Sequence, residues 1–390
     1  MKALRKVAPR PDGLELVEIP LPRCAPGDLV IRVRAASLCG TDAHIYNWDG
    51  SVRDKILAAT GNFARPLTLG HEFCGDVVEV GGAVRGVGED AAEPIRPGDF
   101  VSAESHIPCG TCYQCRHGQP HVCVNESIIG VQRDGAFAEY IALPAACAWK
   151  NDPATIPVEV ACIEEPFGNA VHAATGFEVR DRCVVVFGAG PIGLFSIIVA
   201  NAEGAARVIV VDTAPYRLDL ARAVGAHAAL RTEAGPLDEA GRVRERERLV
   251  GRIRDAAAPW EADVVMEMSG HPDAIDAALR AVRRGGGVVL FGLPKQEAVT
   301  LHRYAEDVIF GGVTLKGIIG RRIYATWTRT RALVSRPEVR VAIRTIITHG
   351  FPLERYEEAF RTMIGRESGK VILSMTGDGT GVPAEGGALP

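Results

Sequence analysis

The segment SLCGTDAHIYNWDG, residues 37–50, places three side chains that can do chemistry within six positions. Cys39 can bind a metal as a thiolate, Thr41 can accept and donate a proton at one oxygen, and His44 carries the side-chain type that exchanges protons near neutral pH. A second segment, LGHEFCG, holds His71 and Glu72 in direct succession. A single cysteine or histidine is usually structural, so these residues become informative only as a combination.

The segment CGTCYQCRHGQPHVC contains four cysteines in the spacing C-x2-C-x2-C-x7-C, namely Cys109, Cys112, Cys115 and Cys123. Four thiolates so close in sequence can complete a tetrahedral shell, as in structural zinc sites, and an iron–sulfur cluster would also take four cysteines. Such a closed shell leaves no position for a substrate. The motif therefore predicts a loop that is held together by a metal.

The segment VVVFGAGPIG carries the pattern G-x-G-x-x-G at Gly188, Gly190 and Gly193, between an expected strand and an expected helix. These glycines allow a tight turn, close approach of the backbone to a pyrophosphate, and packing of the helix on the strand. Asp212 ends the next strand, RVIVVD, where a carboxylate binds the ribose hydroxyls of NAD and repels the 2′-phosphate of NADP. Arg217 raises NADP as an alternative, but the acid should dominate, and NAD is the predicted cofactor.

The composition is that of an ordinary globular protein of 390 residues, with 47% hydrophobic and 24% charged residues. A net charge of -4 and a pI near 6.2 give no basic surface for nucleic acid or an anionic membrane. The mixed-sign run GRVRERERLVGRIRD, residues 241–255, is interpreted as a solvated helix face. Without an apolar segment of signal-peptide or membrane-span length, we expect a cytoplasmic protein whose ten cysteines serve metals rather than disulfides.

Two patterns of apolar residues along the chain predict two kinds of domain. Up to about residue 150, short β-rich runs such as LVIRVRAAS and CGDVVEV are broken by Gly and Pro, which favours an antiparallel or barrel-like β domain. After Pro166, apolar runs such as CVVVFGAG and DVVMEMSG alternate with helical segments, which favours a parallel sheet covered by helices on both faces. Residues 232–260 are expected to hold an extra helix. The Gly/Pro-rich tail is expected to be disordered.

Taken in order, these pieces resemble the zinc-dependent medium-chain dehydrogenase/reductase family, the relatives of alcohol dehydrogenase. The resemblance covers about residues 1–375 and rests on CGTDAH, GHE, the four-cysteine segment, PGD before a strand, and GAGPIG with Asp212. The segments HIYNWD and EPFGNAVH are more specific than these general motifs. They resemble the branch of the family that oxidises L-threonine.

The resemblance implies an α/β protein with a GroES-like β-rich catalytic domain at 1–165 that holds a catalytic and a structural zinc. A doubly wound Rossmann domain for NAD is expected at 166–320, a C-terminal return to the catalytic domain at 321–376, and the disordered tail at 377–390. A homo-oligomer, tetramer or dimer, is expected, with neither nucleic acid nor membrane as a partner.

The resemblance also assigns site residues. Cys39, His71 and Glu72 become the catalytic zinc site, and Thr41 with His44 becomes a proton relay. Glu165 becomes a carboxylate near the metal; the sequence does not choose between the two acids, and we place Glu72 on the metal and Glu165 in proton handling. The residues expected to line the cofactor are Gly188, Gly190, Ile192, Gly193, Asp212, Arg217, Phe291, Gly292, Leu293, Ile318 and Ile319.

The expected reaction is NAD-dependent oxidation of a secondary alcohol, with L-threonine giving 2-amino-3-ketobutyrate. Residues 46–49 and His106 are expected near the substrate, although Tyr46 and Trp48 fit packing roles equally well. The segments at 51–66 and 86–97 are longer than the family pattern, so a polyol, diol, amino-sugar or cyclitol dehydrogenase is the alternative. A nucleotide-binding regulator without catalysis is disfavoured, because the whole set of catalytic residue types occurs together.

Overall fold

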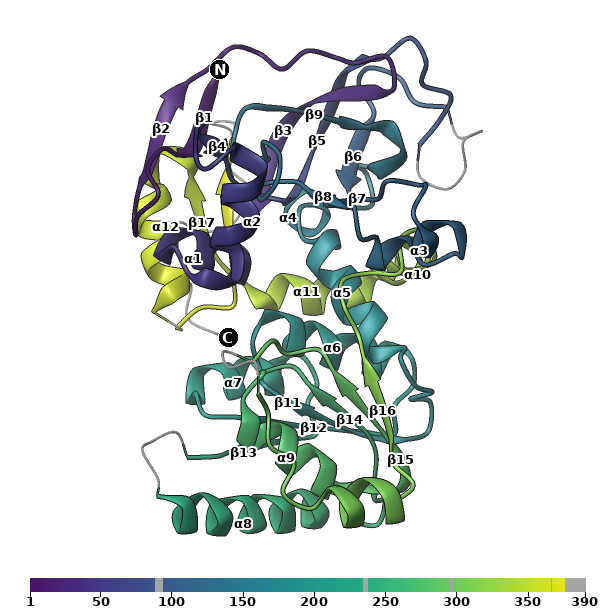
Figure 1. The fold of residues 1–390 in the computed structure, drawn as a ribbon. Coiled ribbons are helices and arrows are strands. Elements are labelled where there is room, and N and C mark those ends of the chain that lie inside the picture. Colours follow the sequence, from purple (N-terminus) through teal and green to yellow (C-terminus); the bar gives the residue numbers. More distant parts are fainter. Residues whose placement is uncertain (88–93, 234–237, 295–297, 366, 376–390) are drawn as a thin grey trace. The chain divides into compact units, whose positions relative to one another are not determined.

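The computed structural model describes residues 1–87, 94–233, 238–294, 298–365 and 367–375. The chain divides into two compact units (Figure 1). The first unit contains Met1–Pro166, Arg322–Thr328 and Ile347–Pro390, and the second contains Phe167–Arg321 and Arg329–Ile346. The expected disordered tail at 377–390 lies outside the described residues, as do residues 88–93 of the longer segment at 86–97.

The first unit is built on a seven-stranded sheet in the order β10-β6-β5-β3-β18-β17, with β9 pairing β3 as well. All of its strand pairs are antiparallel except β17 with β18. Two smaller sheets, β2-β1-β4 and β7-β8, complete the unit and confirm the predicted β-rich domain. Its strands are β1 (Lys2–Lys6), β2 (Leu14–Glu18), β3 (Asp28–Ser37), β4 (Leu67–Thr68), β5 (Glu72–Val80), β6 (Phe100–Ala103), β7 (His106–Ile107), β8 (Ser127–Ile128), β9 (Tyr140–Pro144), β10 (Ala148–Lys150), β17 (Ile347–Pro352) and β18 (Lys370–Ser374).

Short helices connect these strands and carry several of the predicted site residues. The helices of this unit are α1 (Gly40–Asn47), α2 (Gly50–Thr60), α3 (Tyr113–Arg116), η1 (Pro120–Val122), η2 (Ala145–Cys147), α4 (Val158–Ala161), η4 (Leu353–Arg355) and α12 (Tyr356–Ile364). Two further helices, α5 (Glu164–Ala174) and α10 (Ala325–Val334), run across the boundary between the units.

The second unit is a six-stranded, fully parallel sheet in the order β13-β12-β11-β14-β15-β16. Helix α6 contacts α7 and α11, while α8 contacts α9, so two separate layers of helices cover the sheet (Figure 1). This is the predicted doubly wound arrangement, and strands covered on both faces explain the continuous apolar runs. Its elements are β11 (Cys183–Phe187), α6 (Pro191–Ala202), β12 (Arg207–Asp212), α7 (Pro215–Ala223), β13 (Ala228–Arg231), α8 (Glu239–Ala257), β14 (Ala262–Glu267), α9 (Pro272–Ala281), β15 (Val282–Leu290), η3 (Tyr304–Phe310), β16 (Thr314–Gly317) and α11 (Pro337–Ile346).

Two segments differ in form from the sequence-based expectation. The long segment after Gly50 is the helix α2, because Val52 and Ile56 bury against the core on one helical face and Gly61 ends the helix with φ 63°. The expected C-terminal return is interrupted, since residues 329–346 lie with the second unit. There Arg329 pairs with Glu203 at 2.6 Å.

The charged run at 241–255 forms most of α8, as expected, but one of its arginines is not solvated. Arg246 is buried, and its Nε lies 2.9 Å from Oδ2 of the buried Asp276. The same oxygen lies 3.1 Å from Nε of Arg280. One buried carboxylate therefore serves two nearly buried guanidinium groups and ties α8 to α9.

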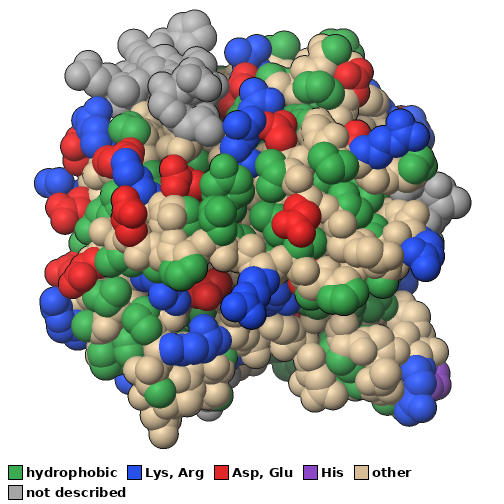
Figure 2. Space-filling view, turned by 90° about the horizontal axis from the view of Figure 1, so that it is seen from above, with side chains coloured by type: hydrophobic (Ala, Val, Ile, Leu, Met, Phe, Trp, Pro, Cys, Tyr) green, Lys and Arg blue, Asp and Glu red, His purple; other side chains and the backbone are tan. Residues whose placement is uncertain are grey.

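The exposed charges of the protein show no preference for one sign on the face drawn in Figure 2, where basic, acidic and apolar side chains alternate. This fits the weakly acidic net charge. Among the described residues, no helix combines the length and apolar character that crossing a membrane requires.

Removing the shared carboxylate should destabilise the second unit strongly. We expect Asp276→Ala to lower the free energy of unfolding by about 3 kcal/mol, because it removes the buried counter-ion that Arg246 and Arg280 share. Arg246 then keeps the more distant Asp273, at 3.4 Å, and Arg280 keeps Glu247 and Asp307. Asp219→Ala is the matched control, since Asp219 pairs with Arg222 at 2.6 Å on the exposed surface and should cost less than about 0.5 kcal/mol. Urea unfolding of the two variants measures the difference, and equal losses would contradict the structural role of Asp276.

Candidate active site

Strand pairing in the first unit brings the predicted metal ligands together. Ser37, the last residue of β3, pairs with Glu72, the first residue of β5. Cys39 follows two residues after Ser37 as the N-cap of α1, and His71 directly precedes β5. The predicted ligands therefore come from the ends of two hydrogen-bonded strands, and the register of that pair sets their spacing.

The turn before His71 depends on a glycine. Gly70 has φ 89°, and a Cβ at this position would lie 2.3 Å from the ring of Phe137. Only glycine meets both conditions without a shift of the backbone or of the buried ring. This explains the glycine of the segment LGHEFCG.

Cys39, His71 and Glu72 each offer one ligand atom, and the three atoms lie within 4.8 Å of one another. Sulfur, imidazole nitrogen and carboxylate oxygen are the donors that zinc takes in proteins, and three protein ligands leave a position for a substrate oxygen. His71 and Glu72 are buried, and Nδ1 of His71 has no hydrogen-bond partner within the described part of the chain. The residues present fit a catalytic zinc ion.

Glu72 is held by two further groups. Its Oε2 accepts hydrogen bonds from Nζ of Lys370 and from Oγ of Ser37. Lys370 begins β18, which pairs antiparallel with β3, and Lys370 Nζ also donates to the carbonyl oxygen of Leu38 at 2.8 Å. Lys370 is buried, yet the charge of Glu72 keeps its pKa raised against the effect of burial.

The second predicted acid, Glu165, lies outside the group of three ligand atoms. It stands in the first turn of α5, is buried, and its Oε1 accepts a hydrogen bond from Oγ of Ser105 at 2.5 Å. Of the two acids between which the sequence could not choose, the structure brings Glu72 to ligand distance with Cys39 and His71.

The charges around the site act on one another through a dry interior. Burial alone would lower the pKa of His71, but the charges of Asp42, Cys39 and Glu165 raise it well above its usual range. Burial raises the pKa of Asp42 to about 6. Asp42 Oδ1 lies 3.8 Å from Nδ1 of His71, and its Oδ2 accepts from the backbone N–H of Cys39 at 2.8 Å. Asp42 therefore contacts two of the three predicted ligands at once.

The predicted relay residues lie on the helix that Cys39 begins. Thr41 Oγ1 is 3.8 Å from the sulfur of Cys39, and His44 follows one helical turn later. His44 is exposed, and its Nδ1 is 2.7 Å from Oδ2 of Asp49. A carboxylate on one ring nitrogen fixes the orientation of the imidazole and leaves the other nitrogen for proton transfer.

The aromatic residues of HIYNWD pack rather than face solvent. Tyr46 stacks on Phe360 with ring centroids 5.0 Å apart, and Trp48 meets Phe63 edge-on at 5.7 Å. These contacts give both residues the packing roles that the sequence allowed. His106, the other candidate for substrate contact, is half-buried, with Nδ1 3.1 Å from Oε2 of Glu126.

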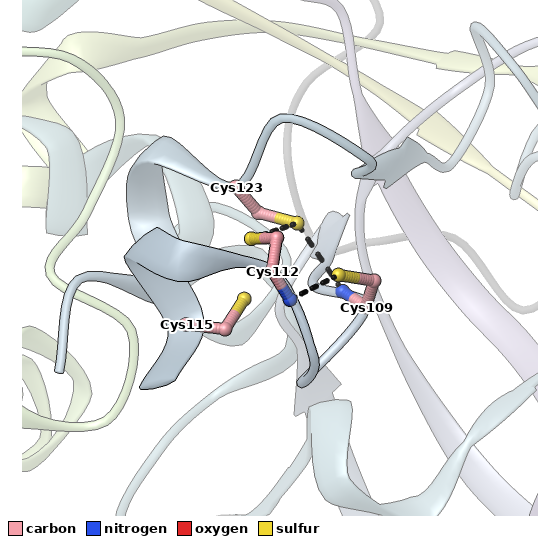
Figure 3. A group of neighbouring side chains, drawn as sticks. All are labelled: Cys109, Cys112, Cys115 and Cys123. Carbon is pink, nitrogen blue, oxygen red and sulfur yellow. Dashed lines mark hydrogen bonds between the residues drawn. The ribbon is translucent and has the colours of Figure 1, made fainter. Parts of the chain in front are cut away.

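The four cysteines of the second motif converge around one point, with all four sulfurs within 4.8 Å of one another (Figure 3). The sulfurs of Cys112 and Cys123 are 3.7 Å apart, too far for a disulfide. Zinc–sulfur bonds of about 2.3 Å in a tetrahedron place sulfurs about 3.8 Å apart, so the spacing fits a closed zinc shell. The loop therefore fits the predicted structural metal site.

Backbone groups of the loop favour thiolate at its first cysteine. The N–H and hydroxyl of Thr111 and the N–H of Cys112 lower the pKa of Cys109 to about 5. Burial and the neighbouring thiol groups raise the pKa of Cys115 to about 12. A bound cation would favour the thiolate at every position, because metal coordination deprotonates a thiol.

The glycine motif of the second unit forms the expected turn between β11 and α6. Gly188 has φ 93°, and Gly190 is the N-cap of α6. A Cβ on Gly193 would lie 1.9 Å from the carbonyl oxygen of Gly188, so the helix approaches the turn as closely as a glycine permits. The first turn of α6 also carries Ile192, and its N-terminal N–H groups suit a pyrophosphate.

Asp212 ends β12 beside this turn and already accepts two hydrogen bonds. Its Oδ2 accepts from the backbone N–H of Ala189 in the glycine motif at 2.6 Å, and its Oδ1 accepts from that of Ala214 at 2.8 Å. The carboxylate thus holds the glycine turn in addition to its predicted role toward ribose. Arg217 lies half-buried in α7, which follows directly.

A further acid at the same edge of the sheet escaped the sequence-based prediction. Glu267 ends β14 and is fully buried. Its Oε1 accepts hydrogen bonds from the backbone N–H groups of Ser269 at 2.8 Å and of Gly270 at 3.1 Å. A Cβ on Gly292 would lie 2.8 Å from the other oxygen of Glu267. The acid therefore shapes the turn that faces Gly292, one of the predicted cofactor residues.

The remaining predicted cofactor residues follow β15 and β16. Phe291 donates its backbone N–H to the carbonyl of Glu267 at 3.0 Å, and Ile318 donates to that of Leu290 at 3.0 Å. Leu293 and Ile319 are exposed, at 86% and 54%. Because the strands are parallel, their carboxyl ends bring these residues and the glycine motif to one edge of the sheet.

Three other residues of the first site also escaped prediction. Asp42 was read only as part of CGTDAH, although its position three residues after Cys39 is that of a capping acid. Lys370 is a charged residue at the start of the apolar run VILS. A charge at the start of a buried strand indicates a buried partner of opposite charge, and this was the available signal. Ser105 gives no signal in a single sequence, because buried serines are common and its partner is 60 residues away.

Comparisons with known proteins agree with this geometry. Residues 25–153 match the alcohol dehydrogenase GroES-like domain, and residues 191–336 match the zinc-binding dehydrogenase domain. The chain therefore belongs to the zinc-binding alcohol dehydrogenase family, as its motifs predicted.

Comparison with individual proteins shows which members of the family this chain is similar to. The L-threonine 3-dehydrogenase of Symbiobacterium thermophilum is 41% identical over 374 residues, which covers 96% of this chain and 97% of that protein. The alcohol dehydrogenase of Thermus sp. ATN1 superposes with a TM-score of 0.80 at 27% identity, over 96% of this chain and 99% of that one. A zinc-binding dehydrogenase of Sinorhizobium meliloti, solved with NADP bound, superposes with a TM-score of 0.76 at 28% identity. The match covers 96% of this chain and 98% of that one.

The two clusters of ligand atoms predict that each binds its own zinc ion. We expect Cys39→Ser to remove one zinc per chain and Cys112→Ser to remove the other, as measured by elemental analysis of the purified variants. Cys24→Ser is the control, because Cys24 belongs to neither cluster and its sulfur donates to the backbone carbonyls of Ala25 and Asp28. A zinc content that is unchanged in Cys39→Ser would contradict a metal at the first cluster.

Proposed function

We propose that this protein is an NAD-dependent L-threonine 3-dehydrogenase that oxidises the secondary hydroxyl of L-threonine to give 2-amino-3-ketobutyrate. The observation that carries the proposal is the cluster of Cys39, His71 and Glu72 in a chain that is 41% identical, over nearly its whole length, to an L-threonine 3-dehydrogenase. The NAD preference, the two zinc ions and the roles of single residues are parts of the proposal.

The first cluster would hold the catalytic zinc, and the cysteine loop would hold the structural one. A zinc ion with an open position acts as a Lewis acid that lowers the pKa of an alcohol hydroxyl by many units. Cys39 and Glu72 bring negative charge to this position, and Lys370 fixes the carboxylate of Glu72 through its Oε2. The buried surroundings strengthen these electrostatic effects.

The hydroxyl proton would leave through the helix that begins at Cys39. Thr41 Oγ1 can accept this proton while it donates its own, and Nε2 of His44 is the next acceptor along the helix face. Asp49 would hold the other ring nitrogen of His44, since the two atoms are 2.7 Å apart. Because His44 is exposed, the proton can pass from it to bulk water.

The cofactor would bind at the carboxyl edge of the parallel sheet, with its pyrophosphate at the glycine turn and its adenosine ribose at Asp212. The acid at this strand end supports NAD rather than NADP, because a 2′-phosphate would meet a carboxylate that already holds the turn through Ala189. Arg217, in the adjoining helix, is the residue that could favour NADP.

We also propose that the chain forms a homo-oligomer. Strand β16 is an edge strand whose four residues are all exposed, and Ile309 and Phe310, which precede it in the chain, are 56% and 64% exposed. An exposed strand edge with apolar neighbours is suited to pairing with a second chain. Light scattering on the purified protein measures the number of copies.

A turnover screen tests the substrate. NADH formation is expected to be fastest, as kcat/KM, with L-threonine, and slower by at least about tenfold with 2,3-butanediol, sorbitol and amino-cyclitols, which differ in the groups beside the hydroxyl. Faster turnover of a diol or polyol would replace L-threonine by the alternative substrate class. No turnover of any of these alcohols would favour a nucleotide-binding role without catalysis.

Asp212→Gly should change the choice of cofactor. We expect the KM for NAD to rise at least about tenfold, because a charged hydrogen-bond partner of the ribose is lost, while the KM for NADP changes less. Asp219→Ala in α7 is the control, since this exposed acid pairs with Arg222 of the same helix at 2.6 Å. An unchanged ratio of the two KM values would remove Asp212 from the ribose site.

His44→Ala should lower kcat about a hundredfold without changing the KM for NAD, because it interrupts general-base proton transfer. Asp49→Asn should have a smaller effect, since it only loosens the orientation of the ring. Added imidazole should restore part of the rate of His44→Ala. A kcat within twofold of the unsubstituted protein would exclude the relay through His44, and Asp54→Asn, an exposed change in α2, controls for surface effects.

A further inference from the structure

A serine hydroxyl lies against the second acid of the active site. Ser105 follows β6, is fully buried, and donates through Oγ to Oε1 of Glu165 at 2.5 Å. A buried carboxylate requires donors to offset the loss of hydration, and a hydroxyl that points at one of its oxygens also sets its direction. The contact therefore influences the orientation of the Glu165 carboxylate.

The backbone around Ser105 is fixed on both sides. The N–H of Ile129 donates to the carbonyl oxygen of Ser105 at 3.0 Å, and the N–H of Glu104 donates to that of Cys147 at 2.7 Å. The carboxylate of Glu104 in turn accepts from Nε1 of Trp327 at 2.8 Å. The carbonyl of Ser105 and both the backbone and the side chain of the preceding Glu104 are thus held, so Ser105 presents its hydroxyl from a fixed position.

Glu165 is the acid whose role the ligand distances leave open. It lies outside the Cys39–His71–Glu72 group, while its charge acts on the buried His71 and Lys370. Glu72 has a hydroxyl of its own, Ser37, and the ammonium group of Lys370. The two acids thus accept hydrogen bonds from different hydroxyl groups, Glu72 from Ser37 and Glu165 from Ser105.

We propose that Ser105 is a positioning residue of this site: its hydroxyl holds the Glu165 carboxylate in the orientation in which it serves the Cys39–His71–Glu72 centre. Ser105 acts through Glu165 and contacts neither substrate nor cofactor in this role. The inference rests on the proposed function, since it gives Glu165 its task.

The chain offers a matched control in the strand that precedes Ser105. Ser102 is equally buried, and its Oγ donates to the carbonyl oxygen of Ala161 at 2.8 Å. The same Oγ accepts a hydrogen bond from Nδ2 of Asn151 at 2.8 Å. Ser102→Ala therefore removes a buried hydroxyl of the same type from the same part of the first unit, but one that donates to a backbone carbonyl rather than to Glu165. A general loss of packing would appear in both variants.

The test combines kinetics with a spectrum of the metal site. Ser105→Ala, Glu165→Ala, the double variant and Ser102→Ala are prepared with zinc for kinetics and with cobalt(II) for absorption spectra, because cobalt d–d bands report the ligand arrangement. For each cobalt-loaded protein, the absorption spectrum of the same protein with the additional change Cys39→Ser is subtracted. The difference spectrum then contains no contribution from the cysteine loop. The bands of that loop serve as an internal measure of folding.

We expect Ser105→Ala to lower kcat about tenfold with little change in the KM for L-threonine, as loss of one charged hydrogen bond implies. The cobalt difference spectrum should shift, and Ser105→Ala should add nothing to Glu165→Ala in either measurement, since the serine acts through the acid. Ser102→Ala should leave kcat and the spectrum unchanged.

Three results would overturn the inference: kcat and spectrum unchanged in Ser105→Ala, an undiminished effect of Ser105→Ala in the Glu165→Ala background, or an equal effect of Ser102→Ala. Failure of the proposed function looks different. In that case Cys39→Ser would leave the cobalt spectrum of the unsubstituted protein unchanged, and L-threonine would not be turned over by any of the proteins.

Discussion

The active site depends on the register in which β3 meets its two neighbours. Ser37 pairs with Glu72 across one edge of β3 and with Ile372 across the other, so one residue aligns three segments that are far apart in the chain. Cys39, His71 and Lys370 take their positions from this alignment. A slip by one residue would turn Glu72 to the opposite face of the sheet and separate it from the other proposed ligands, Cys39 and His71. The chemistry is therefore specified first by backbone hydrogen bonds.

Buried charges then fix what the backbone has brought together. Lys370 and Glu72 form an ion pair in an interior where each alone would be strongly unfavourable, and Asp42 stands beside His71 in the same way. Such pairs add little net stability, because desolvation offsets their attraction, but they tolerate few alternative arrangements. Geometry, rather than stability, is what these acids contribute. The cysteine loop uses the same principle with thiolates, where backbone N–H groups already favour the charged form at Cys109.

The sequence was informative where chemistry and spacing coincide. The glycine turn at Gly188, the four cysteines and the succession His71–Glu72 each carry a pattern that few other folds need, and the parallel strands showed as continuous apolar runs. It was uninformative where a role depends on a distant partner. Lys370 meets Glu72 across 298 positions, and Glu267 acts on a turn that only the assembled sheet creates. Helix α2 was missed for a simpler reason, since Val52 and Ile56 give it only a weak amphipathic pattern.

The position of β18 has a consequence for synthesis. The first unit takes strands from both ends of the chain, whereas 155 consecutive residues, Phe167–Arg321, supply most of the second. During synthesis on a ribosome, most of the second unit can fold while the sheet of the first still lacks β18. The carboxylate of Glu72 can pair with the ammonium group of Lys370 only after residue 370 has emerged. Pairing of such distant strands is slow and leaves an open sheet edge in the meantime. The proposed metal site is thus among the last parts to be completed, after the parallel sheet of the second unit can already have formed.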